Sequence, residues 1–337
     1  MVSKKRALTL SDSTSSTTIV FDIDGTLVDV TKSYLWTILE TSRLYCEKIL
    51  GWENTPPHTE WFTQNHVNDL KKLKGFNSDY VCATALIIFI LDNVEITPTL
   101  PKDPSPPICP GSYAAYLNKS VSEIQEAWKL YIRSFSDSPN DLPLTKLQNS
   151  PHKPFVLDEG SLLEKNYIER LFQEIYLGDQ FEGFYGTSRL FYEGEGKYKK
   201  EELLIPPTLL AELKERNFEL GIYTGRPRED LDLALDYFNL RGYFPPHLMI
   251  SLTDSLESGS NGKPDPWGLL ELKKRLPESI HYIFVGDSVD DMSAAHSAGW
   301  VGLFYGQNET HQFQTEKTLA LPNWENWWPL LQSVIRK

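Results

Sequence analysis

The sequence has few cysteines, and none of them forms a recognisable pair. Among 337 residues there are three, Cys46, Cys82 and Cys109, with no CxxC spacing. An odd and small number argues against a disulfide framework. We therefore expect a protein of a reducing compartment, with a cytoplasmic location.

Three common catalytic signatures are also missing. The seven histidines are scattered and show neither HExxH nor HxxxH spacing, so the pattern does not favour a zinc hydrolase. The chain has no GxSxG motif, which argues against an α/β-hydrolase serine nucleophile. The glycine-rich stretch near residue 194 lacks the spacing and the Gly-Lys-Ser/Thr ending of a P-loop.

Positive charge and long apolar runs are scarce as well. Lys and Arg number 33 against 46 Asp and Glu, for a net charge of −13, which argues against nucleic acid or an anionic membrane as partner. The longest apolar run, residues 83–91, is too short to cross a bilayer. Residues 1–16 are rich in Ser, Thr and Lys without an apolar stretch, which predicts a disordered tail rather than a secretory signal.

From about residue 200 onward, helical patterns alternate with short apolar strands. This alternation predicts right-handed crossovers and a doubly wound parallel α/β sheet with helices on both faces, joined by a first strand at residues 18–22. The predicted helices cover residues 206–217, 228–240, 265–276 and 290–299, and the predicted strands cover residues 218–225, 247–254, 281–288 and 300–306.

The section between the first strand and residue 200 has a different texture. Its spacing predicts a mostly α-helical insertion, interrupted by Pro-rich stretches at 95–111 and 136–154. We therefore divide the chain into a core of residues 17–31 and 200–337 and a helical insertion of residues 32–199. The helices expected in the insertion cover residues 31–50, 59–74, 78–92, 121–135 and 161–176.

The first strand ends in two aspartates, Asp22 and Asp24, followed by Gly25. Asp-Gly between apolar residues is a strong β-hairpin signal, so a simple turn is one interpretation. However, a helical pattern rather than a second strand follows Val28. Asp22 is then expected at the carboxyl end of a parallel strand, where open α/β sheets bind ligands.

Later strands of the predicted sheet also end in polar residues. Thr224 and Asp287 each lie at the end of a strand, Asp291 comes four residues after Asp287, and Lys263 lies in a turn before a helix. Taken singly, these residues fit ordinary turns, helix N-termini and solvated lysines. Taken together, they place several carboxylates at one sheet edge, where their repulsion favours a cation such as Mg²⁺ and where Lys263 and Thr224 could bind phosphoryl oxygens.

Four short segments, read in chain order, carry a resemblance to a known family. "DIDGT", "YTGR", "GKPDP" and "GDSVDD" resemble the four motifs of the haloacid dehalogenase superfamily, over residues 17–29 and about 200–306. The helical insertion after the first motif resembles the C1-type cap of subfamily I. The resemblance implies a Rossmann-like core beneath a cap domain, and a phosphatase-like hydrolase.

The resemblance also implies roles for individual residues. Asp22 would be the nucleophile that forms an aspartyl-phosphate, and Asp24 the general acid and then the general base. Mg²⁺ would be held by the carboxylate of Asp22, the backbone carbonyl of Asp24 and Asp287. Thr224 and Lys263 would bind the phosphate.

Three further residues have supporting roles in this scheme. Asp291 would orient Lys263 or a metal-bound water, with Gly225 and Arg226 beside the phosphate site. Arg226 is in addition a candidate for binding an anionic group of the substrate. Asp24 argues for phosphoryl transfer over dehalogenation, because a halide leaves without needing a proton.

A cap over the site implies a small substrate. The segment "LKKLKGFNSD" between two cap helices is the candidate specificity loop, with Lys74 and Asn77 as its candidate residues. We therefore expect a Mg²⁺-dependent phosphatase that hydrolyses a small phosphorylated metabolite.

Three alternatives stay open at this point. A phosphomutase of the same family is the first. A phosphonate-cleaving relative is the second, and it would need a cap lysine that forms a Schiff base. The lysines of the insertion that are candidates for this role are Lys32, Lys48, Lys71, Lys72 and Lys74. The third is a binding or scaffold protein that could use the Pro-rich stretches and the Trp-rich segment 321–331, whose tryptophans are otherwise expected to pack on the core.

Overall fold

The structure is a computed structural model that describes most of the chain. It covers residues 17–53, 62–73, 75–76, 78–94, 113–114, 119–136, 143–276, 281–306 and 318–335. The predicted tail at residues 1–16 and the first Pro-rich stretch at 95–111 lie outside the described residues.

A six-stranded parallel sheet forms the centre of the core, in the order β10-β9-β8-β1-β6-β7. From β1 the chain adds β6 and β7 on one side, and then β8, β9 and β10 on the other. The direction therefore reverses between β1 and β8, and this switch point is where open α/β sheets bind ligands. The strands are β1 (Thr17–Phe21), β6 (Glu219–Tyr223), β7 (Met249–Ile250), β8 (His281–Gly286), β9 (Val301–Tyr305) and β10 (Thr318–Leu321).

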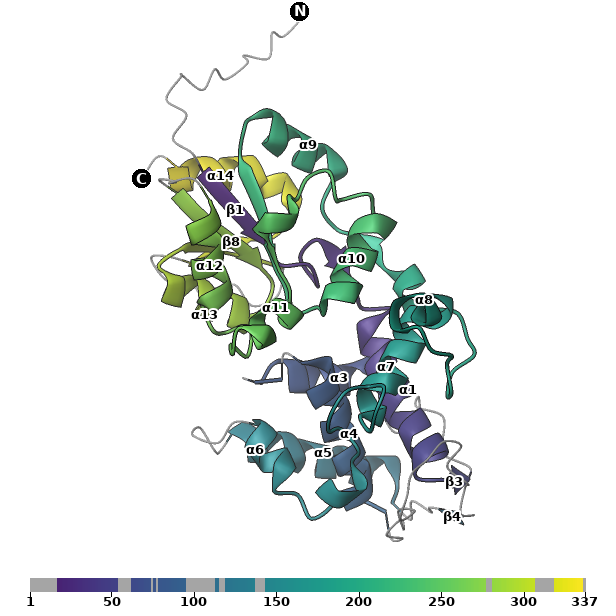
Figure 1. Cartoon of the computed structure of the whole chain (residues 1–337). Helices are drawn as coiled ribbons and strands as arrows, with labels where there is room; N and C mark the ends of the chain where they lie inside the picture. Colours follow the sequence, from purple (N-terminus) through teal and green to yellow (C-terminus); the bar gives the residue numbers. More distant parts are fainter. Residues whose placement is uncertain are drawn as a thin grey trace, which may run out of the picture.

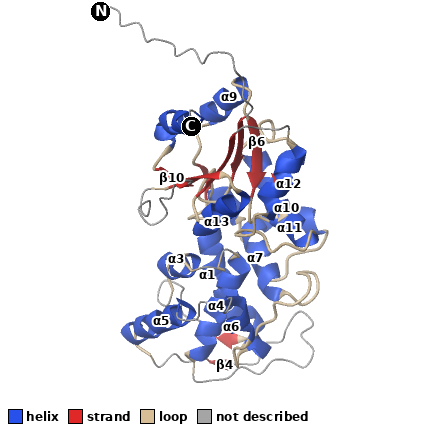
Figure 2. Cartoon of the chain, turned by 90° about the vertical axis from the view of Figure 1, so that its left-hand side faces the viewer, coloured by secondary structure: helices blue, strands red, loops and turns tan. Residues whose placement is uncertain are grey.

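Helices cover both faces of this sheet (Figure 2). Ile19 and Phe21 of β1 point into one buried cluster with Leu210, Leu235 and Trp327 of three different helices. The intervening β1 residue, Val20, belongs to a second cluster on the opposite face. The alternation along β1 thus confirms the doubly wound fold. The helices are α9 (Pro207–Glu215), α10 (Arg228–Tyr237), α11 (Leu252–Glu257), α12 (Trp267–Arg275), α13 (Val289–Ala298) and α14 (Trp327–Ile335).

Two details of the core differ from the sequence prediction. The strand expected at 247–254 is wrong beyond Ile250, because Ser251 begins helix α11 with a capping box in which its side chain accepts from the N–H of Asp254. Strand β10 and helix α14 were not expected as such. The expected packing of the C-terminal tryptophans is confirmed, since Trp324 and Trp327 are both buried against the sheet.

The mostly helical part lies to one side of the carboxyl end of the sheet and has a hydrophobic cluster of its own (Figure 1). Its helices correspond to the five predicted ones, with α6 and α8 in addition. They are α1 (Tyr34–Leu44), continued by π-helical residues Tyr45–Ile49, then α3 (Gln64–Lys71), α4 (Asp79–Asp92), α5 (Val121–Ser136), α6 (Pro143–Gln148), α7 (Tyr167–Leu177) and α8 (Phe181–Tyr185). Short 3₁₀ turns lie at Lys153–Phe155, Gly178–Gln180 and Lys197–Lys200, and strands β3 (Trp52–Glu53) and β4 (Tyr113–Ala114) form a small parallel pair.

A two-stranded antiparallel pair marks the point where the chain leaves the core and returns to it. Strand β2 (Val28–Asp29) pairs with β5 (Glu202–Leu203), more than 170 positions later in the numbering. Because β2 pairs with β5 and not with β1, the hairpin interpretation of Asp24-Gly25 is wrong. Among the described residues, no helix is both long and apolar enough to cross a membrane.

Candidate active site

Three neighbouring strands end in polar side chains at the same edge of the sheet. Asp22 follows β1, Thr224 follows β6 and Asp287 follows β8, and β1 lies between the other two strands. Phe21 of β1 is in register with Val285 of β8, and the N–H of Asp22 donates to the carbonyl of Val285 at 2.9 Å. The structure therefore brings together the side chains that the strand pattern placed at this edge.

The loop after β1 is a tight turn that depends on glycine. The N–H groups of Leu27 and Val28 both donate to the carbonyl of Ile23, at 2.8 and 2.9 Å. Gly25 has φ +72°, and a Cβ at this position would lie 2.0 Å from Oδ2 of Asp287. A side chain here is excluded both by the backbone conformation and by the neighbouring carboxylate.

Lys263 connects two of the carboxylates. Its Nζ lies 2.7 Å from Oδ1 of Asp22 and 2.6 Å from Oδ1 of Asp291, and its side chain is only 2% exposed. Burial alone would lower the pKa of Lys263, but the two carboxylates outweigh it and raise that pKa. Asp291 is itself fixed, because its Oδ2 accepts from the N–H and the hydroxyl of Ser288. The predicted orientation of Lys263 by Asp291 is therefore a direct ion pair.

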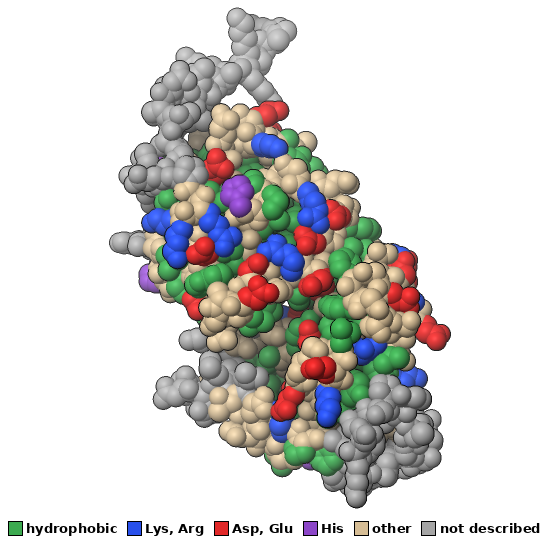
Figure 3. Space-filling model, in the orientation of Figure 1, with side chains coloured by type: hydrophobic (Ala, Val, Ile, Leu, Met, Phe, Trp, Pro, Cys, Tyr) green, Lys and Arg blue, Asp and Glu red, His purple; other side chains and the backbone are tan. Residues whose placement is uncertain are grey.

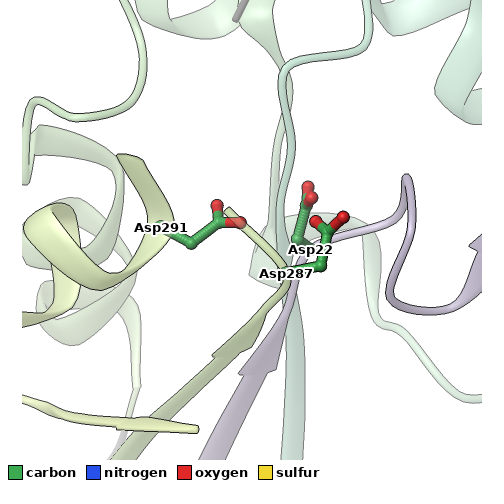
Figure 4. A group of neighbouring side chains, drawn as sticks. All are labelled: Asp22, Asp287 and Asp291. Carbon is green, nitrogen blue, oxygen red and sulfur yellow. The ribbon is translucent and has the colours of Figure 1, made fainter. Parts of the chain in front are cut away.

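The carboxylates of Asp22, Asp287 and Asp291 face a common space (Figure 4). Burial raises the pKa of Asp22 to about 7, with Asp291 and Asp24 adding to the rise and Lys263 opposing it. The pKa of Asp287 is also well above its usual value, through burial first and then through Asp291 and Asp22. One ammonium group is thus not enough to neutralise this cluster.

This cluster fits a divalent cation. Each of its three members offers an oxygen atom, and these atoms lie within 4.8 Å of one another. Mg²⁺ prefers oxygen ligands from one or two carboxylates, and a dication would relieve the repulsion that raises the pKa of Asp22 and of Asp287. Asp22 and Asp287 were predicted as ligands, and Asp291 is an additional carboxylate of the group. The carboxylate of Asp24 is engaged elsewhere, which is compatible with the prediction that Asp24 would contribute only its backbone carbonyl.

Thr224 lies where a phosphate-binding hydroxyl was predicted. It is buried, and its N–H donates to the carbonyl of Ile250 at 3.0 Å, which fixes the end of β6 against β7. Its hydroxyl oxygen accepts from the N–H of Arg226 at 3.2 Å, across the exposed Gly225. This local turn fixes the backbone of Arg226 relative to Thr224.

Arg226 is enclosed by protein groups. Its side chain is 0% exposed and contacts Asp24 at 2.6 Å and Glu201 at 3.2 Å. A third group, the hydroxyl of Tyr176, accepts from Nη1 at 2.8 Å. This arrangement does not support our expectation that Arg226 binds an anionic group of the substrate, because its guanidinium has no face open to a ligand.

The geometry agrees with the comparison of the chain with known families. A family model described as haloacid dehalogenase-like hydrolase matches residues 163–299. Residues 163–299 are thus similar to the haloacid dehalogenase-like hydrolases. The matched range holds Thr224, Lys263, Asp287 and Asp291, whereas Asp22 precedes it. The structure joins the two parts by placing Asp22 against Lys263.

Similar proteins are found by sequence and, for the fold, by structure. Phosphonoacetaldehyde hydrolase from Bacillus cereus (strain G9842) is 34% identical over 105 residues, which is 30% of this chain and 38% of the relative. The match thus spans well under half of that relative's length. An X-ray structure from the Northeast Structural Genomics Consortium matches with a TM-score of 0.61 at 19% identity, covering 95% of this chain and 99% of the other. A predicted phosphoglycolate phosphatase from Haemophilus somnus 129pt matches with a TM-score of 0.52 at 16% identity, over 94% and 99% of the two chains.

The helical part of the chain contributes charged groups near the sheet edge. Lys71 at the end of α3 pairs with Asp79 at the start of α4, at 2.6 Å. Burial would lower the pKa of Lys71, but Asp79 outweighs it and raises that pKa, with Asp24 adding to the rise. Burial is the main cause of the raised pKa of Asp79, which Lys71 opposes and the charge of Asp24 increases. The predicted specificity residues, Lys74 and Asn77, lie outside the described residues.

Three site residues were not predicted from the sequence: Glu201, Tyr176 and Tyr34. They surround Arg226, and the ring of Tyr34 lies 5.0 Å from its guanidinium carbon. A tyrosine on the apolar face of a helix is a signal, because its buried hydroxyl needs a partner. No such signal exists for Glu201, because the sequence predicts that a glutamate following several lysines is exposed to solvent.

Proposed function

We propose that this protein is a Mg²⁺-dependent phosphatase that hydrolyses a small phosphomonoester through an aspartyl-phosphate on Asp22. The observation that carries the proposal is the convergence of Asp22, Asp287 and Asp291 around Lys263 at the switch point of the sheet. A carboxylate nucleophile needs neighbouring positive charge to approach an anionic phosphoryl group. Lys263 supplies one such charge, and the carboxylate cluster is suited to hold a second.

In the first half-reaction, a carboxylate oxygen of Asp22 attacks phosphorus. The bond from phosphorus to the leaving oxygen breaks, and that oxygen takes the proton of the Asp24 carboxyl group. In the second half-reaction, water attacks the phosphorus and Asp24 accepts the proton of that water. The bond between phosphorus and Asp22 then breaks, which releases inorganic phosphate and restores both carboxyl groups.

The remaining residues bind and orient the transferred group. The ammonium of Lys263 and the hydroxyl of Thr224 would contact the phosphoryl oxygens, where charge develops during transfer. Asp22, the carbonyl of Asp24 and Asp287 would hold Mg²⁺, and this ion would neutralise charge on the phosphoryl group. The helical part above the sheet edge would exclude water and limit the substrate to a small molecule.

Phosphonate cleavage through a cap lysine is the second candidate, since the similar Bacillus protein is named as a phosphonoacetaldehyde hydrolase. Lys71 is the described cap lysine that shares the electrostatic environment of Asp24. Schiff-base formation requires a neutral amine, so a catalytic lysine normally has a lowered pKa. The pKa of Lys71 is raised by Asp79 despite burial. This charge state favours phosphate-ester hydrolysis over phosphonate cleavage.

A panel of sugar, alcohol and carboxylic-acid phosphates tests the proposal. With Mg²⁺ we expect release of inorganic phosphate from at least one ester, and loss of that release in EDTA. Asp22→Asn and Asp24→Asn should abolish it, whereas Asp232→Asn, which alters a partly exposed carboxylate of α10 that pairs with Arg241, should retain it.

Each contrary outcome points to one alternative. Isomerisation of a sugar phosphate without release would favour a phosphomutase. Cleavage of phosphonoacetaldehyde that is abolished by Lys71→Arg would favour a phosphonatase. No turnover of any substrate, together with stable capture of a protein partner, would favour a scaffold and contradict the proposal.

A further inference from the structure

A buried network of polar side chains surrounds Arg226 and joins the sheet edge to the helical part. Arg226 donates through Nε to Oδ1 of Asp24 at 2.7 Å, and its Nη2 lies 2.6 Å from the same oxygen. Nη2 also contacts both carboxylate oxygens of Glu201 at 3.2 Å. Nη1 donates to the hydroxyl of Tyr176 at 2.8 Å.

The partners of Arg226 come from separate parts of the chain. Asp24 lies in the loop after β1, Glu201 lies where the chain returns to the core, and Tyr176 belongs to α7. The ring of Tyr34 of α1 is tilted against the ring of Tyr176, with centroids 4.6 Å apart, and both centroids lie within 6.0 Å of the guanidinium carbon. Arg226 is therefore held between the core and two helices of the helical part.

The network is closed by further hydrogen bonds to Glu201. The hydroxyls of Tyr176 and Ser33 donate to its Oε1, at 3.0 and 2.9 Å. Ser33 lies at the start of the helical part and Glu201 at its end, so one carboxylate joins both connecting segments. A guanidinium can serve this many acceptors because its donors are fixed in one plane, which a lysine ammonium cannot reproduce.

The contacts from Arg226 fix the orientation of the Asp24 carboxyl group and leave its second oxygen, Oδ2, out of contact with Arg226. Both contacts from Arg226 fall on Oδ1, and among the described residues no side chain hydrogen-bonds to Oδ2. The side chain of Asp24 is 29% exposed, whereas those of Arg226 and Glu201 are 0% and 2% exposed. Oδ2 is thus the atom through which Asp24 can exchange a proton with a leaving group or a water.

We propose that Arg226 is a positioning residue that aims the proton-transferring carboxyl of Asp24 and links its orientation to the helical part through Tyr176 and Glu201. This inference rests on the proposed function, because it assigns Asp24 the proton transfer of a phosphatase. The role differs from substrate binding, since Arg226 itself touches no reacting atom. Movement of α7 relative to the sheet would shift Tyr176 and hence Arg226, and would therefore change the orientation of the Asp24 carboxyl group.

The test distinguishes a changed orientation of the Asp24 carboxyl group from a general disturbance of the active site. p-Nitrophenolate leaves phosphorus without a proton, whereas an alkoxide needs one, so formation of the aspartyl-phosphate requires Asp24 only for an alkyl ester. Single-turnover formation of the phosphoenzyme is measured with p-nitrophenyl phosphate and with glycerol phosphate, in the parent, Arg226→Gln, Arg226→Lys and Tyr176→Phe proteins with Mg²⁺. Breakdown of the phosphoenzyme is followed in the same experiment.

We expect Arg226→Gln to slow phosphoenzyme formation from glycerol phosphate by about 10²-fold or more, and to slow it from p-nitrophenyl phosphate by less than about 10-fold. Breakdown should also be slow, which gives a burst of nitrophenolate. Arg226→Lys should not restore the parent rates, because an ammonium group lacks the planar set of N–H donors that a guanidinium has. Tyr176→Phe keeps its buried ring and should show the same pattern at smaller size, which keeps the test informative if Arg226→Gln fails to fold.

Tyr45→Phe is the matched control. It removes a buried tyrosine hydroxyl that bonds to Phe155 and Leu157 within the helical part, away from Arg226. It should leave the ratio of the two rates unchanged. Equal slowing with both esters in Arg226→Gln and Tyr176→Phe would overturn the positioning role. Absence of turnover by the parent itself would overturn the proposed function, and this inference with it.

Discussion

Gly25→Ala is the substitution that most directly links the geometry of the site to activity. Gly25 has φ +72°, and a Cβ there would lie 2.0 Å from Oδ2 of Asp287, against 3.4–4 Å for an ordinary contact. The Asp287 carboxylate must therefore move by more than about 1 Å, and a misplacement of that size can cost about 10²-fold in rate. An alanine at positive φ adds about 1–2 kcal/mol of strain.

The expected result for Gly25→Ala is a loss of about 10²-fold or more in kcat/KM, together with weaker activation by Mg²⁺. The free energy of unfolding, measured by urea denaturation, should fall by only about 1–2 kcal/mol. Gly299→Ala is the matched control, since Gly299 has φ +77° but nothing lies within 4 Å of its added Cβ. It should show the same loss of stability with nearly full activity. Equal activity in the two variants would refute the role assigned to the position of Asp287.

Two further substitutions test the charges around the site. Lys263→Met leaves Asp22 and Asp291 without their shared cation, so the free energy of unfolding, measured by urea denaturation in EDTA, should fall by about 3–5 kcal/mol. Adding Asp291→Asn to this variant should recover part of the lost stability. No recovery would contradict this electrostatic explanation. Burial raises the pKa of Asp230 from 3.8 to about 7, so the folded protein holds a proton that the unfolded chain releases, and stability falls as pH rises between these values. Asp230→Asn removes this dependence and should raise the unfolding free energy at pH 8 by up to about 4 kcal/mol, with little change near pH 4; a less stable variant at pH 8 would contradict it.

The parallel sheet could be predicted because its strands are short apolar runs separated by helical patterns. The prediction was wrong after Ile250, where the apolar run continues through Leu252. Local capping chemistry decided this boundary, since Ser251 and Asp254 bond to each other's backbone and start α11. Strand β10 has four residues, and its pairing with β9 depends on contacts that the local pattern does not reveal.

The residues at the sheet edge were predictable for a physical reason. Parallel strands end at one edge, so Asp22, Thr224 and Asp287 had to lie near one another once the order of strands was right. The network around Arg226 was not predictable, because Asp24 lies 202 positions away and Tyr176 lies in the inserted helices. Such contacts depend on how the helical part packs on the core, which the spacing of residues within one helix does not encode.

The most direct test of the central claim is to locate the phosphoryl group during turnover. Asp24→Asn protein is mixed with Mg²⁺ and p-nitrophenyl phosphate, quenched in acid and digested, and the peptides are mapped by mass spectrometry. Because this variant lacks the base for the second half-reaction, we expect a phosphoryl group on Asp22, and none at that position in Asp22→Asn. A phosphoryl group on another residue, or none on Asp22 while the parent releases phosphate, would contradict it.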